Sequence, residues 1–170
     1  MTGSAIDPLL AALAAGDEEA FEKVHKRFAA KMFWAALRML DHRQDAEDVV
    51  QQVFADFIGA KARWVEVNDL SAYLFSSLRH AAYKTASRRR RQPIANTELA
   101  ADAAAMTLGR SDESPHNERL VRCLAGLPLK QREIIALKID GELTFAQIGE
   151  VLGVSARRMS SVAVRNEPFT

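Results

Sequence analysis

The segment Leu70–Arg91 holds the residues best suited to binding nucleic acid. It contains no Asp or Glu, and its basic side chains lie among or just after aromatic rings. Basic groups bind phosphates, and aromatic rings stack on unpaired bases. A solvated charge run and a patch for lipid headgroups are the alternative interpretations of this segment alone. The candidate nucleic-acid-binding residues are Tyr73, Arg79, His80, Tyr83, Lys84, Arg88, Arg89, Arg90 and Arg91.

The segment Leu143–Ser155, LTFAQIGEVLGVS, has the pattern of a helix-turn-helix. Thr144 and Gln147 have the spacing of a capping box, and Gly153 permits a tight turn before a second helix. The second helix of such a motif enters the major groove of DNA, whereas a plain pair of packed helices is the alternative. The candidate DNA-binding residues here are Thr144, Gln147, Ser155, Arg157 and Arg158.

A third segment, about Gln44–Ile58, is the clearest amphipathic helix that the sequence predicts. Its apolar residues recur at steps of three and four and predict a buried stripe of Ala46, Val49, Val50, Val53, Phe54 and Phe57. The opposite face is acidic and amide-rich, with Asp45, Asp48, Gln52 and Asp56, flanked by Glu47 and Gln51. On an isolated helix such a face indicates solubility rather than binding.

Helical spacing of apolar residues continues almost throughout the chain, so the predicted fold class is all-α. Pro128 is expected to open a helix that Gly141 caps. Residues 92–115 are rich in Ala, Asp, Ser and Thr, which is typical of a flexible interdomain linker. We therefore expect two small helical domains, residues 1–91 and residues 116–170, of which the second is a helix-turn-helix domain.

The composition excludes several other classes of protein. The net charge is +1, and a single cysteine, Cys123, allows no internal disulfide or Cys-based metal site. No apolar run approaches the roughly 18 residues of a membrane span, and residues 1–7 are not typical of a secretory signal, so we expect a cytoplasmic protein. The histidines are scattered and no catalytic motif occurs, so no catalytic residue, metal or cofactor is expected.

These three segments resemble, in their order, the extracytoplasmic-function family of RNA polymerase sigma factors. DAEDVVQQVF, residues 45–54, is similar to the polymerase-binding motif of that family, and Leu70–Arg91 is similar to its promoter-melting helix. Leu124–Ser155 resembles its second DNA-binding domain. The similarity extends from about Leu9 to Ser155.

The resemblance implies a sigma factor that binds core RNA polymerase and directs promoter recognition and melting. The basic helix would engage the minus-ten element as it melts, and the helix after Ser155 would read the minus-thirty-five element. Core polymerase and promoter DNA are the implied partners, and an anti-sigma protein is a further candidate. The implied polymerase-binding residues are Asp45, Asp48, Gln51, Gln52 and Phe54.

Two departures from the family pattern affect this expectation. His80 and Lys84 stand where the family often has Asn and Asp, which predicts a more basic surface and altered promoter specificity. After Ser155 the chain reads ARRMSSVAVRNEPFT, where β-branched residues and Ser are poor helix formers and Pro168 ends any helix. We therefore expect a shortened or altered recognition helix and weak binding to the minus-thirty-five element, or a tail that arose from a shifted reading frame.

Other functions remain open on the sequence alone. A helix-turn-helix regulator that acts without polymerase would leave the acidic and amide-rich face unexplained. A degenerate sigma factor would titrate polymerase or a partner without starting transcription, and the altered tail favours it. An enzyme lacks any set of candidate residues, and a membrane-surface protein would rest on the Arg88–Arg91 run alone. Charge segregation further indicates that the basic helix can fold against the acidic second domain.

Overall fold

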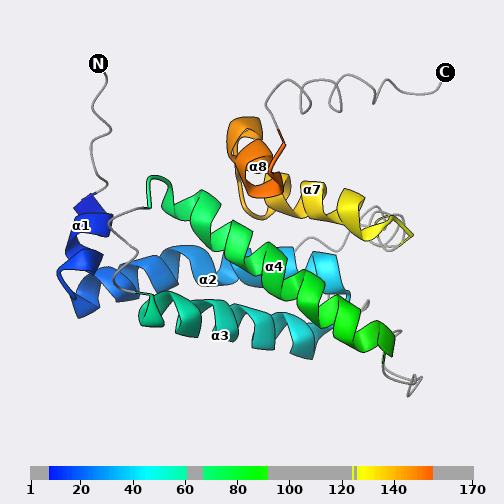
Figure 1. The fold of residues 1–170 in the computed structure, drawn as a ribbon, viewed down its shortest axis with the longest axis horizontal. Coiled ribbons are helices and arrows are strands. Elements are labelled where there is room, and N and C mark those ends of the chain that lie inside the picture. Colours follow the sequence, from blue (N-terminus) through cyan, green and yellow to red (C-terminus); the bar gives the residue numbers. More distant parts are fainter. Residues whose placement is uncertain (1–7, 61–66, 92–123, 125, 155–170) are drawn as a thin grey trace, which may run out of the picture.

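The computed structural model describes residues 8–60, 67–91, 124 and 126–154. Regular structure in these ranges is helical, which confirms the all-α class (Figure 1). The predicted linker and the candidate residues Ser155, Arg157 and Arg158 lie outside the described residues. The helices are α1 (Pro8–Ala14), α2 (Glu18–Leu40), α3 (Arg43–Gly59), α4 (Leu70–Arg91), α7 (Leu129–Ile139) and α8 (Phe145–Leu152).

Helices α2, α3 and α4 pack on one another, because each presents a buried apolar stripe to the other two. The stripe predicted on α3 is confirmed, since its six apolar residues are all buried. Polar caps define the helix ends. The side chain of Asp17 accepts a hydrogen bond from the backbone N–H of Glu19 at 2.9 Å, and the ring of His42 caps α3 by accepting from Asp45 N–H at 3.2 Å.

Helices α7 and α8 pack on the opposite side of α2 and α4 from α3 (Figure 1). The predicted capping box is confirmed, because Thr144 and Gln147 exchange side-chain and backbone hydrogen bonds at the start of α8. The predicted turn at Gly153 is confirmed as well, with φ at 65°. No helix within the described ranges is long and apolar enough to cross a membrane.

The turn between α7 and α8 differs from the expectation for Gly141. The C-cap of α7 is Asp140, and the left-handed residue of the turn is Glu142, with φ at 54°. Gly141 is required for another reason, which is close packing. A Cβ atom on Gly141 would lie 2.7 Å from the Leu137 carbonyl oxygen and 3.2 Å from the ring of Phe75 on α4. The glycine therefore lets the second helical pair approach α4.

Candidate nucleic-acid interface

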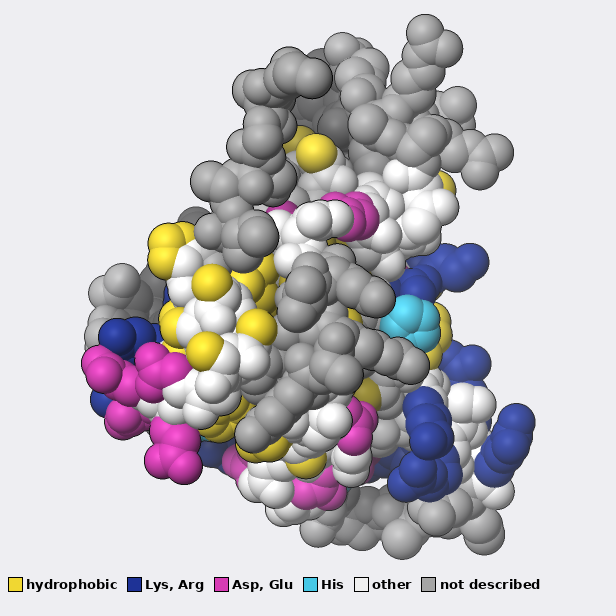
Figure 2. Space-filling model, turned by 60° about the vertical axis from the view of Figure 1, so that its left-hand side comes forward, with side chains coloured by type: hydrophobic (Ala, Val, Ile, Leu, Met, Phe, Trp, Pro, Cys, Tyr) yellow, Lys and Arg dark blue, Asp and Glu magenta, His cyan; other side chains and the backbone are white. Residues whose placement is uncertain are grey.

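The exposed flank of α4 carries a row of basic side chains. His80, Lys84 and Arg88 recur at every fourth position, so they lie on one side of the helix. They form one wall of a groove of about 690 Å³ between α3 and α4. Figure 2 shows several Lys and Arg side chains along the right-hand side of the molecule, near a histidine. This flank can bind phosphate groups along its length.

The facing wall of the groove belongs to α3 and is acidic and amide-rich. Asp48, Gln52 and Asp56 line it, and the Gln52 amide donates a hydrogen bond to Asp56 at 2.8 Å. Asp48, Gln51 and Gln52 are exposed, so these three predicted polymerase-binding residues lie on the surface. A nucleic acid would be repelled by this wall, whereas a protein with hydrogen-bond donors would fit it.

The structure places the other two predicted polymerase-binding residues differently. Asp45 is half-buried, and its carboxylate lies 3.2 Å from the guanidinium of Arg89, which joins the first turn of α3 to the basic end of α4. Phe54 belongs to the core, with only 6% of its surface exposed, and its ring packs 4.8 Å from the His25 ring. Phe54 is therefore removed from the candidate surface, because its side chain falls on the apolar stripe of α3 rather than on the polar face.

Two of the predicted nucleic-acid-binding residues, Arg79 and Tyr83, contact α7 and are half-buried. Both donate to the carboxylate of Glu133, Arg79 through its Nε and Tyr83 through its hydroxyl at 2.8 Å. The Arg79 guanidinium also lies 4.9 Å from the centre of the Tyr83 ring. Burial, followed by the hydrogen bond to Glu133 and the charge of that carboxylate, raises the pKa of Tyr83 to about 12.

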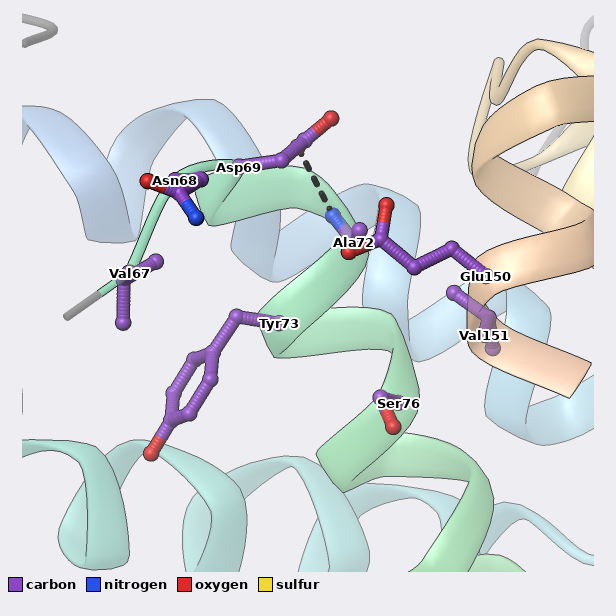
Figure 3. Close-up of a pocket in the computed structure, with 8 residues that line it drawn as sticks. All are labelled: Val67, Asn68, Asp69, Ala72, Tyr73, Ser76, Glu150 and Val151. Carbon is purple, nitrogen blue, oxygen red and sulfur yellow. Dashed lines mark hydrogen bonds between the residues drawn. The ribbon is translucent and has the colours of Figure 1, made fainter. Parts of the chain in front are cut away.

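A pocket of about 340 Å³ lies where the start of α4 meets α8 (Figure 3). The ring of Tyr73 lines it from α4, and Glu150 and Val151 line it from α8. Asp69 holds the region together, because it accepts from Ala72 N–H at 3.0 Å and from the Gln147 amide at 2.7 Å. Gln147, a predicted DNA-binding residue, is thus engaged within the chain, whereas Thr144 is exposed.

Sequence reasoning missed Glu133 and Asp69. Glu133 lies one helical turn from both Leu129 and Leu137, so it interrupts the apolar face of α7, and a lone acid in such a face is the signal that marks it. Asp69 directly precedes α4, the position that Asp favours as an N-cap. Within the described residues, no group of three or more His, Cys, Asp or Glu side chains is placed to hold a metal ion.

Comparison with protein families assigns the two halves of the chain to one class. Residues 24–92 match the model of sigma-70 region 2, which contains α3 and α4, and residues 117–161 match the model of sigma-70 region 4, which contains α7 and α8. The region 4 match continues past Ser155, where the sequence resemblance was expected to end. The two matches make up about two thirds of the chain. The chain belongs to the sigma-70 family.

Individual relatives indicate which branch of the sigma-70 family the chain resembles. The chain is 26% identical to the extracytoplasmic-function (ECF) RNA polymerase sigma factor SigK of Mycobacterium ulcerans (strain Agy99), over 92% of this chain and 86% of SigK. The solved structure of CnrH in complex with the cytosolic domain of CnrY is similar in fold, with a TM-score of 0.63 and 23% identity over 92% of this chain and 88% of that chain. The chain is therefore an ECF-type sigma factor, which directs promoter recognition together with RNA polymerase.

Proposed function

We propose that the exposed polar face of α3, formed by Asp48, Gln51 and Gln52, is the surface that binds core RNA polymerase. The observation that carries this proposal is the groove between α3 and α4, whose two walls have opposite character. A protein bound on the acidic wall would leave the cationic wall beside it for DNA. The two partners of a sigma factor would then meet along one groove.

The cationic row of α4 would bind the backbone of the melted minus-ten strand. Lys84 and Arg88 supply exposed positive charge with His80 on the same side of the helix, and the ring of Tyr73 lines a pocket at the start of the same helix. An unpaired base that leaves the stack needs both a phosphate contact and a pocket with a ring or apolar wall. The helix-turn-helix that begins at Thr144 would contact the minus-thirty-five element as duplex DNA. The predicted weakness of that contact concerns residues outside the described ranges and stays a prediction.

The remaining parts of the proposal concern the setting of this activity. The chain would act in the cytoplasm, carry no cofactor and catalyse no reaction itself, because polymerase forms the phosphodiester bonds. The domain boundaries would lie at residues 91 and 116, at either end of a linker. The complex of CnrH with the cytosolic domain of CnrY supports an accessory protein partner, an anti-sigma factor, for this chain as well.

A pull-down with purified core polymerase tests the assignment of α3. We expect the combined change Asp48→Ala, Gln51→Ala and Gln52→Ala to weaken binding by at least about tenfold, because interface residues at the centre of a contact dominate its affinity. Glu22→Ala is the matched control, since it also removes one exposed acid, on α2, whose partner is Lys26 on the same helix. Equal loss in the control, or no loss in the triple variant, would exclude α3 as the docking surface.

A further inference from the structure

The contact between α4 and α7 buries a carboxylate against two side chains, Arg79 and Tyr83, that the sequence predicts to bind nucleic acid. Glu133 is only 2% exposed, and both of its oxygens accept from α4, one from Arg79 and one from Tyr83. A buried carboxylate is costly unless it is paired and hydrogen-bonded, so this arrangement is stable only while α7 stays against α4.

A carboxylate that accepts from a guanidinium and a phenol is a close chemical substitute for a DNA phosphate, which uses the same donors. We propose that Glu133 holds the free chain in a closed form by occupying Arg79 and Tyr83, and that these two residues bind promoter DNA only after α7 has moved away. This inference rests on the proposed function, since it concerns how the DNA-binding surface of α4 becomes accessible.

Further contacts hold α7 and α8 against α2 and α4 and reinforce the closed form. Arg38 on α2 pairs with Asp140 at the end of α7 through two hydrogen bonds of 2.6 and 3.0 Å, and both side chains are largely buried. The Asp69–Gln147 hydrogen bond ties the start of α8 to the start of α4. Glu150 and Val151 of α8 form part of the wall of the pocket that Tyr73 lines, so closure also places α8 beside that pocket (Figure 3).

The closed form thus divides α4 into a covered flank and an open flank. Arg79 and Tyr83 are half-buried and engaged with Glu133, whereas His80 and Lys84 remain exposed. A chain in this form offers phosphates only part of the cationic surface. Its apparent affinity for DNA is lowered by the small fraction of molecules that are open.

The first test measures binding of the full chain to a fluorescein-labelled oligothymidylate by anisotropy at low salt. Glu133→Gln keeps the shape of the side chain but removes its charge, so it should bind the oligonucleotide about tenfold more tightly than wild type. Glu22→Gln is the matched control, because it removes one exposed acid whose partner, Lys26, lies on the same helix and not across the interface. Adding Arg79→Ala to Glu133→Gln should cancel the gain.

A second test does not depend on how well a buried substitution is tolerated. Lys31 and Glu142 are in direct contact and lie outside the proposed DNA and polymerase surfaces, so a Lys31→Cys, Glu142→Cys chain in a Cys123→Ser background can be joined by a reducible cross-linker. We expect the joined chain to bind the oligonucleotide at least about tenfold more weakly than the same chain after reduction.

The outcomes separate the two proposals. If Glu133→Gln binds the oligonucleotide no better than wild type, or if the joined and reduced chains bind equally, closure by Glu133 is wrong even when core polymerase is still bound. Failure of every form to bind core polymerase would instead refute the proposed function. A gain in Glu133→Gln that Glu22→Gln shares would be a net-charge effect and would also overturn the inference.

Discussion

Gly141→Ala is expected to destabilise the contact between α4 and the α7–α8 pair. The added Cβ would lie 2.7 Å from the Leu137 carbonyl oxygen, which belongs to the backbone of α7 and cannot swing aside. It would also lie 3.2 Å from two ring atoms of Phe75, whose side chain is fully buried. Overpacking of this kind typically costs about 1–3 kcal/mol in the free energy of unfolding.

Urea unfolding followed by circular dichroism measures that cost, and Gly59→Ala serves as its control. Gly59 ends α3, a Cβ atom added to it would meet no other atom within 4 Å, and its φ is not in the left-handed region. Alanine there should leave stability unchanged or raise it by up to about 1 kcal/mol, because it restricts the unfolded chain. If Gly141→Ala and Gly59→Ala changed the unfolding free energy by the same amount, the close approach of Gly141 to Phe75 of α4 would be refuted.

Two smaller predictions follow from single side chains. Thr144→Ala should lower the free energy of unfolding by about 1 kcal/mol because it removes the cap of α8, whereas Thr144→Ser should retain most of it, as thermal melting can measure. The pKa of Tyr83 is about 12 in the folded chain against an ordinary value of 10.0, so the unfolded chain loses this proton at a lower pH than the folded chain does. The contribution of protonated Tyr83 to the stability of the fold is therefore full below pH 10 and is lost as pH rises toward 12. An absorbance titration of Tyr73→Phe, which leaves Tyr83 as the one tyrosine of the chain, should show this raised pKa, and addition of Glu133→Gln should lower it.

The helices of the fold could be predicted because their signals are local. The stripe from Ala46 to Phe57 repeats at three and four residues, and burial of the whole stripe follows from that period. The spacing of Thr144 and Gln147 alone likewise predicts the start of α8. Such features depend on neighbours within one or two helical turns, so the sequence contains them in full.

Features that depend on distant partners could be predicted only in outline. Charge segregation indicated that the basic helix can fold against the second domain, but the partner of Arg79 is Glu133, which lies 54 positions away. The close approach at Gly141 also needs Phe75 from another helix, so the residue type alone indicated a cap instead. Phe54 was assigned to a binding surface on family resemblance, although its place in the apolar stripe already indicated the core.

Transcription in vitro tests the central claim most directly, because it requires both polymerase binding and promoter recognition. Purified core RNA polymerase would be supplied with genomic DNA of the source organism, with and without the full chain, and the 5′ ends of the transcripts would be mapped. The account predicts new 5′ ends that depend on the chain and share a minus-ten sequence upstream. Polymerase binding without any new 5′ end would contradict it, and would identify a factor that occupies polymerase without starting transcription.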